Sequence, residues 1–391
     1  MGSESLPPPI SVGILASGPH PIETLYRPAL CALSDLFTIA AIHTCPSTSS
    51  TSPSLEITDI LTHKDISLVL NFMPNEYHEL YTIAALQAGK HVVVEAPVSL
   101  SIPSARRILD TEKDAPNGAK VFVASARRYV PCFENTFKSE VHGLGKILYA
   151  RLRMITGLHV AHTATSHENT GDEQENENAN ILDHGRENEG REPSDKKARR
   201  KGLMEEIFGK DKQPNRERLA LSRFLASLGC HDLGLMRDTL GYPDAVSKVS
   251  LNEPFYSAFF HYNRTDAGHG THPFTLMYET GTDSVPRCDA QLAVYGQDKT
   301  VTMQYDLPSA PEQLVRIIVE TTDEHGELKR TETTSTWAEA YQEELKALYA
   351  YLSHGTEPKT TARDSLQDIK LFQTMFEQYD RQCGTIRTPL G

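Results

Sequence analysis

The sequence predicts an α/β protein of two domains: an N-terminal parallel sheet with flanking helices, and a C-terminal α+β domain with a large, mostly antiparallel, open sheet. Three observations predict this class. The chain has 391 residues, more than one hydrophobic core usually supports. Residues 68–94 follow a strand–helix–strand pattern. Residues 246–334 alternate short apolar strands with turns.

The unit at residues 68–100 is the clearest local signal. Residues 68–72 form a short apolar run, as expected for a strand buried on both faces. Apolar residues then recur at helical spacing over 80–86, and Gly89 ends that helix. A second apolar strand covers 91–94. A helix that joins two such strands predicts a βαβ unit with parallel strands.

The other elements of the first domain extend this pattern. Residues 10–15 and 37–42 are predicted strands on either side of a helix at 25–36, and residues 121–124 are the last strand. The turn after the first strand, residues 16–21, occupies the place of a dinucleotide-binding G-x-G-x-x-G turn. Only its middle glycine is present, as Gly18.

The composition argues against several function classes. A net charge of -13 argues against a nucleic-acid partner. No stretch approaches the roughly 20 apolar residues that cross a bilayer, and the N-terminus lacks the features of a signal peptide. The 6 cysteines show no C-x-x-C spacing, which predicts free thiols in a reducing cytoplasm and no metal site.

Residues 163–218 are crowded with charged and amide side chains. So few apolar residues cannot offset the entropy of ordering, which predicts a disordered insertion at 163–200 with a short helix at 203–208. The acidic half is followed by a basic run at 196–201, which leaves open self-association or a partner. A tolerated loop insertion is the favoured interpretation.

Several stretches resemble the Gfo/Idh/MocA family of NAD(P)-dependent oxidoreductases. They are MPNEYH, AALQAGKHVVVE with Glu95-x-Pro97, the Gly145-Lys146-Ile147 strand start, SLGCHDLG and HGTEP. The resemblance covers nearly the whole chain except the insertion and a mobile tail at residues 1–9. It implies a Rossmann dinucleotide-binding domain at 10–127 and a substrate and oligomerisation domain at 128–391. The last helix of the second domain would return near the first, and a homodimer would form through the large sheet.

The resemblance also implies a nicotinamide cofactor. An acidic residue usually ends the second strand of an NAD enzyme, but this sequence has His43-Thr44-Cys45 there. That change favours NADP over NAD only slightly, and a vestigial or absent cofactor stays open. The implied cofactor contacts are Ala16, Ser17, Gly18, Thr44, Met73, Pro74, Asn75, His78, Glu95 and Pro97.

The family's usual proton-transfer groups are mostly replaced. Ala96 stands where the family has a lysine, and Ser227 stands where it has an aspartate. His231 matches in register and is the expected acid–base residue, although a core-facing histidine is an equal alternative. The stretch Arg127-Arg128-Tyr129 resembles the family's turn into the second domain. The candidate substitutes for the missing groups are Arg128, Tyr129, Tyr77 and His78.

Three functions remain open from the sequence. The first is an NAD(P)-dependent oxidoreductase with an altered proton relay, which acts on a small non-sugar metabolite. The second is a redox-neutral enzyme that uses His231 for an isomerisation, elimination or cyclisation. The third is a non-catalytic sensor similar to the galactose regulator Gal80. The loss of both proton-transfer residues disfavours an ordinary sugar dehydrogenase.

Overall fold

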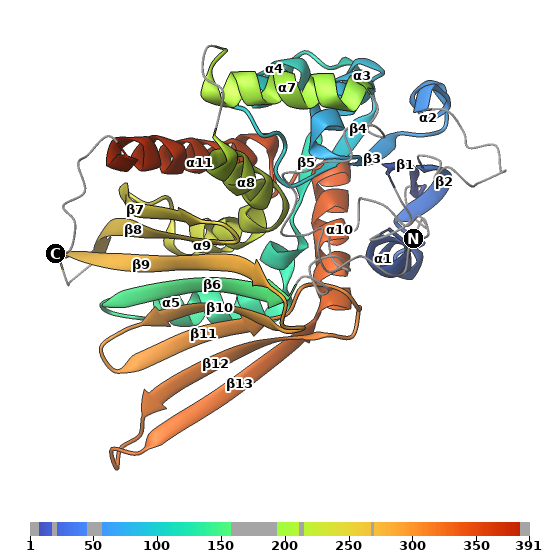
Figure 1. Cartoon of the computed structure of the whole chain (residues 1–391). Coiled ribbons are helices and arrows are strands. Elements are labelled where there is room, and N and C mark those ends of the chain that lie inside the picture. The colour runs from blue at the N-terminus through green and yellow to red at the C-terminus, as the bar shows by residue number, and fades with distance from the viewer. Residues whose placement is uncertain are drawn as a thin grey trace, which may run out of the picture.

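A computed structural model describes residues 8–17, 22–44, 57–157, 194–210, 215–266 and 270–383. Two sheets dominate these residues (Figure 1). The first is a 5-stranded parallel sheet of order β2-β1-β3-β4-β5, and the second is an 8-stranded sheet of order β13-β12-β11-β10-β6-β9-β8-β7. The predicted fold class is therefore confirmed. In the described residues, no helix is long and apolar enough to cross a membrane.

The parallel sheet contains the strands expected from the apolar runs. They are β1 (Ile10–Ala16), β2 (Phe37–Thr44), β3 (Leu68–Phe72), β4 (His91–Glu95) and β5 (Val121–Ala124). Every residue of β3 is buried, as predicted for a strand covered on both faces. The flanking elements are the π-helical turn η1 (Ile22–Tyr26), α1 (Arg27–Ala32), α2 (Ile57–Thr62), α3 (Asn75–Gln87), α4 (Ile102–Lys113) and the short turns η2 (Pro116–Gly118) and η3 (Ala126–Tyr129).

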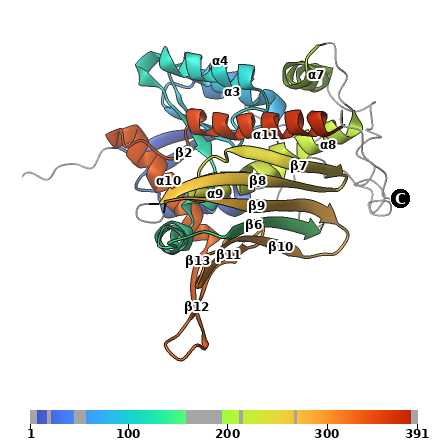
Figure 2. The same ribbon diagram turned by 90° about the vertical axis from the view of Figure 1, so that its left-hand side faces the viewer.

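The large sheet is antiparallel except where β6 pairs with β9. Its strands are β6 (Tyr149–Gly157), β7 (Ala245–Asn252), β8 (Phe255–Asp266), β9 (Gly270–Asp283), β10 (Cys288–Tyr295), β11 (Lys299–Tyr305), β12 (Leu314–Thr322) and β13 (Leu328–Thr336). Its helices and helical turns are η4 (Phe133–Phe137), α5 (Lys138–His142), α8 (Arg216–Phe224), η6 (Leu225–Gly229), α9 (Cys230–Leu240), α10 (Trp337–His354) and α11 (Ala362–Cys383). Figure 2 shows α8, α9 and α11 along one face of this sheet.

The two sheets share one buried core. A continuous apolar cluster includes Phe72 of β3, Tyr129 after β5, Leu152 of β6 and Trp337 of α10. Helix α10 packs against α1 and η3, and α11 packs against α4 and β5. The C-terminal helices therefore return to the parallel sheet and hold the two sheets in one arrangement.

The expectation of a disordered charged segment is wrong for its later part. Residues Ser194–Phe208 form one helix, α7, which begins well before the predicted start at Leu203, and α8 already begins at Arg216. Residues 163–193 lie outside the described part of the chain, as do residues 1–7. Helix α7 crosses close to α3 and α4 (Figures 1 and 2).

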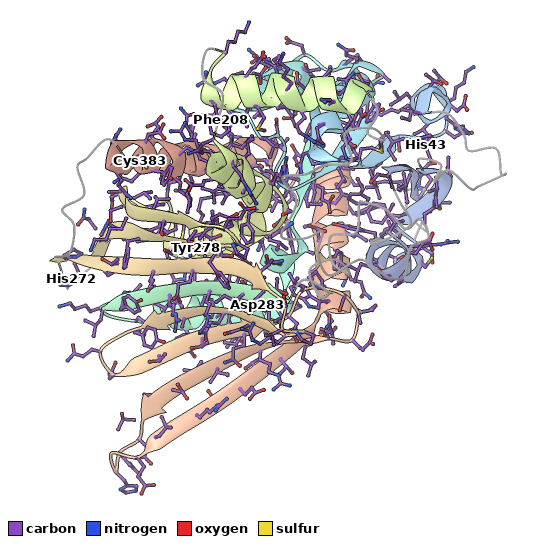
Figure 3. The ribbon with its side chains drawn as sticks, viewed as in Figure 1. His43, Phe208, His272, Tyr278, Asp283 and Cys383 are labelled. Carbon is purple, nitrogen blue, oxygen red and sulfur yellow. The ribbon has the colours of Figure 1, made fainter. Side chains whose placement is uncertain are left out.

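Ion pairs and one apolar anchor hold α7 in place. Arg200 binds Glu76 at 3.0 Å, and Glu206 accepts hydrogen bonds from Arg107 at 2.8 Å and from the Ser101 hydroxyl. Leu203 is buried. Phe208, labelled in Figure 3, packs edge-on against Phe376 of α11, with 5.1 Å between the ring centres. Two packed apolar side chains and charges that are paired across helices thus order a segment whose composition alone predicts disorder.

Replacing Leu203 by Ser should loosen α7 without unfolding the protein. Burial of a leucine side chain contributes about 1.5–3 kcal/mol, and ion pairs that solvent still reaches, as those of α7, contribute less. We expect the backbone amides of residues 194–208 to exchange faster in hydrogen–deuterium exchange mass spectrometry, with little change elsewhere. Lys201→Ser is the matched control, because that side chain is 79% exposed. Equal exchange in the two variants would contradict an anchoring role for Leu203.

Candidate functional site

The candidate site lies at the carboxyl edge of the parallel sheet. Ala16, at the end of β1, pairs with Phe72 at the end of β3, and Glu95 ends the neighbouring β4. Ligands of open parallel sheets usually bind outside this edge. Gly18 lies outside the described residues, and so does the side chain of Thr44. Ser17 is described next to Ala16 and is half-buried.

The turn Glu95-Ala96-Pro97 is fixed by hydrogen bonds. The ring Nδ1 of buried His78 lies 3.0 Å from the Pro97 carbonyl oxygen. The Val98 amide donates to the Ser365 hydroxyl of α11 at 3.0 Å. His78 and Pro97, which were predicted to contact the cofactor, thus also shape this turn.

The start of α3 carries the predicted residues Met73, Pro74 and Asn75. Met73 is buried, and Pro74 directly precedes the first residue of the helix. Among the described residues, the buried Asn75 Oδ1 atom has no hydrogen-bond partner. A buried acceptor without a partner is costly, so a ligand with a donor group fits this position. The residues present are therefore compatible with a nicotinamide dinucleotide.

Helix α9 brings His231 to the Glu95-Ala96-Pro97 turn. The thiol of Cys230 donates to the Ala96 carbonyl oxygen at 3.6 Å, and His231 follows it. Burial lowers the pKa of His231 to about 3, with a further contribution from the Arg127 cation, while Glu95 acts in the opposite direction. At neutral pH the imidazole is therefore uncharged and offers one N–H donor.

Arg127 is the cation beside His231. The sequence marked the adjacent pair Arg127-Arg128, and Arg128 was the one chosen as a site residue. It forms a buried ion pair with Asp232 of α9, and its guanidinium lies 5.5 Å from the centre of the Tyr305 ring. The Tyr305 hydroxyl donates to the same Asp232 oxygen at 2.7 Å. Burial raises the pKa of Asp232, although Arg127 opposes that shift.

Arg128 does not belong to this group. Its guanidinium binds Asp238 of α9 at 3.2 Å and also binds Asp364 of α11, so it joins elements of the second domain. Tyr129 shares a hydrogen bond of 2.7 Å with the Thr360 hydroxyl, and burial raises the pKa of its phenol. Both residues, which were candidates to substitute for the missing lysine, thus hold the η3 turn to the second domain.

Tyr77 and Ser227 also make contacts of their own. The Tyr77 ring stacks on Tyr81 at 5.6 Å and lies 5.5 Å from the Arg199 guanidinium of α7. Burial raises the pKa of Tyr77 to about 12. The exposed Ser227 hydroxyl donates back to the Arg223 carbonyl oxygen at 3.1 Å. In the described part of the chain, no group of histidine, cysteine or acidic side chains could hold a metal ion.

Two family models match this chain. The model described as an oxidoreductase family with an NAD-binding Rossmann fold matches residues 32–124, and the model of that family's C-terminal alpha/beta domain matches residues 222–382. The first match begins after the turn at residues 16–21, so the glycine-poor turn is outside it. The family assignment therefore rests on residues 32–124 and 222–382, and not on that turn.

Known proteins are similar in fold over the whole chain and in sequence over a short part. A glycosyl hydrolase family 109 protein from Shewanella is 34% identical over 61 residues, which are 16% of this chain and only 13% of that protein. The structure of Synechocystis biliverdin reductase with biliverdin and NADP+ has a TM-score of 0.60 at 15% identity and covers 95% of this chain and 99% of that one. Caulobacter crescentus aldose-aldose oxidoreductase, complexed with glycerol, has a TM-score of 0.63 at 16% identity, with 97% and 100% covered. At these identities the structures show the fold alone.

The depressed pKa of His231 predicts that its ring does not titrate between pH 5 and 8. A histidine that stays neutral when buried takes up its proton only on unfolding, so stability should fall as the pH drops below about 6.5. NMR titration of the ring resonances, assigned with His231→Gln, measures this directly. The double variant Arg127→Gln with Asp232→Asn should move the His231 midpoint upward. A wild-type midpoint near 6.5 would contradict this electrostatic description.

Proposed function

Because the chain belongs to the Gfo/Idh/MocA family of oxidoreductases, we propose that it is an NAD(P)-dependent oxidoreductase that acts on a small non-sugar metabolite through an altered proton relay. The observation that carries this proposal is the convergence of His231 and Arg127 beside the Glu95-Ala96-Pro97 turn. That place is where the missing lysine would stand. A neutral imidazole and a fixed cation replace a group that exchanges protons.

The residues that would hold the cofactor frame the edge of the parallel sheet. Ala16 and Ser17 follow β1, and the Asn75 amide begins α3 with its acceptor oxygen unpaired among the described residues. A nicotinamide dinucleotide supplies the hydride donor or acceptor when bound. We favour NADP over NAD, since no carboxylate ends β2.

The altered relay stabilises charge. Arg127 keeps its charge at every physiological pH, so it can attract a developing oxyanion but cannot give up a proton to it. A neutral histidine can still donate a hydrogen bond to such an oxygen, as known enzymes with depressed histidine pKa values do. Reduction of a carbonyl or a conjugated system suits this pair, because negative charge builds up on the substrate.

The alternatives have weaker support. A redox-neutral reaction needs a base that holds a proton, and His231 with a pKa near 3 holds one poorly at neutral pH. A sensor without catalysis would need no such polar pair beside the turn.

We further propose that the protein is a cytoplasmic homodimer that forms through the open face of the large sheet. The described cysteines are all free thiols, which agrees with a reducing compartment.

Fluorescence titration with NADPH and NADH should show micromolar binding, with NADPH the tighter ligand. The expectation follows from the parallel sheet edge and from the Asn75 acceptor, which has no partner among the described residues. It needs no knowledge of the substrate. The quenching of protein fluorescence and the enhancement of nicotinamide emission provide the readout. Absence of binding up to millimolar concentrations would overturn the oxidoreductase proposal and leave the redox-neutral enzyme and the sensor.

Once a reducible substrate is found by NADPH consumption, His231→Ala should lower kcat by roughly 10²–10³, the usual cost of one lost oxyanion donor. His231→Gln keeps an N–H donor and should recover part of that loss. Ser227→Ala is the control and should stay within a few-fold, because that hydroxyl is exposed and bonded within its own helix. An unchanged kcat in His231→Ala would remove His231 from the site. Ala96→Lys tests the same pocket by gain of activity on simple polyols.

A further inference from the structure

Glu344 is a buried carboxyl group that the proposed chemistry does not use. It lies on α10 and is 1% exposed. Its Oε2 accepts a hydrogen bond from the Tyr26 hydroxyl at 3.0 Å, and its Oε1 accepts one from the Ser125 amide at 2.5 Å. Both donors come from the parallel-sheet domain, so one side chain of the second domain joins two segments of the first.

These two segments frame the carboxyl edge of the parallel sheet. Tyr26 ends η1, the first helical turn after residues 16–21. The centre of its ring lies 4.5 Å from that of Phe72 and 4.9 Å from that of Tyr341. Ser125 follows β5 and directly precedes η3, the turn that carries Arg127. A shift of the Glu344 carboxyl would therefore move the first helix and the Arg127 turn together.

We propose that Glu344 is a positioning residue of the dinucleotide site, and that its charge state sets how tightly the site holds a nicotinamide dinucleotide. The inference rests on the proposed function, because it requires that the carboxyl edge binds the cofactor. The geometry supports it through the two hydrogen bonds, which reach the elements on both sides of the site. The bound ligand carries an anionic pyrophosphate, which a nearby carboxylate repels.

The groups that face Glu344 decide when it ionises. Burial raises its pKa to about 7, and the carboxylate of Glu95 at the end of β4 raises it further. The Ser125 amide, the Tyr26 hydroxyl and the Lys359 cation oppose that shift. The phenols of Tyr341 and Tyr129 also interact with it, and burial raises the pKa of both, so they remain neutral.

Ionisation of Glu344 therefore adds a second negative charge beside Glu95 as the pH rises through 7. Cofactor affinity should be highest when the carboxyl is protonated and should weaken at higher pH. The stability of the fold should change in the same direction. A carboxyl whose pKa is raised by folding contributes its full stability below the pKa of the unfolded chain and loses it as the pH passes the folded value.

The test is the affinity for NADH at pH 6 and pH 8, measured by fluorescence titration of the full-length protein. NADH is preferred to NADPH here because it has no phosphate monoester, whose second ionisation falls near pH 6. We expect the Kd of the wild type to rise by roughly three- to tenfold between the two pH values, because one negative charge is added at the edge that would bind the anionic ligand. Glu344→Gln should keep the low Kd at both.

Glu112→Gln is the matched control. Burial also raises the pKa of Glu112, which accepts a hydrogen bond from the Val121 amide at 2.7 Å at the start of β5. That position is at the opposite edge of the sheet, so this variant should keep the pH dependence of the wild type. Equal pH dependence in Glu344→Gln and the wild type would overturn the inference.

Tyr26→Phe provides an independent variant that keeps the ring. It removes one hydrogen-bond donor to the Glu344 carboxylate, so the midpoint of the affinity change should move to higher pH. An unmoved midpoint would overturn the inference, and this test remains available if Glu344→Gln fails to fold. Thermal unfolding with pH gives a readout without ligand, and Glu344→Gln should flatten it. Failure of the wild type to bind NADH or NADPH at either pH would instead overturn the proposed function, and the inference with it.

Discussion

The buried ion pair between Arg127 and Asp232 is the contact on which the arrangement of the candidate site depends. It joins the end of the parallel sheet to α9, and Tyr305 adds a hydrogen bond from the large sheet. Removal of one partner from a buried pair typically costs about 3–5 kcal/mol, because the other charge is left uncompensated. Neither element can therefore move alone. This constraint holds His231, the neighbour of Asp232, beside the turn at Ala96.

The elements that were predicted correctly are those whose signal is local. The apolar runs at Leu68–Phe72 and Val121–Ala124 are strands with those bounds. Helix α7 could not be predicted in the same way, because what orders it lies elsewhere in the chain. Arg200 binds Glu76, which is 124 residues away in the sequence. The composition of a segment carries no information about such distant partners. The entropy argument for disorder is sound only for charges that remain solvated.

The candidate site shows the same division. The register of His231 within its motif marked it as a site residue, and the structure brings its neighbour Cys230 to the turn at Ala96. Arg128 was preferred to Arg127 as a site residue, and its guanidinium binds Asp238 and Asp364. The two arginines are consecutive in η3 and bind different acids, Asp232 and Asp238, both on α9. One sequence offers no way to tell which of two adjacent side chains will point toward the site. The contacts of Glu344 could not be predicted either, since its partners Tyr26 and Ser125 are 318 and 219 residues away in the sequence.

The replacement of the family lysine then has a chemical consequence. A lysine can lose and regain a proton when burial shifts its pKa, whereas an arginine keeps its charge. A site that combines Arg127 with a neutral His231 would therefore offer attraction and one hydrogen bond, since the pKa of His231 is about 3. Glu344, whose pKa is about 7, lies on α10 and accepts hydrogen bonds from Tyr26 and Ser125. Sensitivity to pH would then arise in ligand binding rather than in the chemical step, because the titrating carboxyl positions the site and does not contact the reacting atoms.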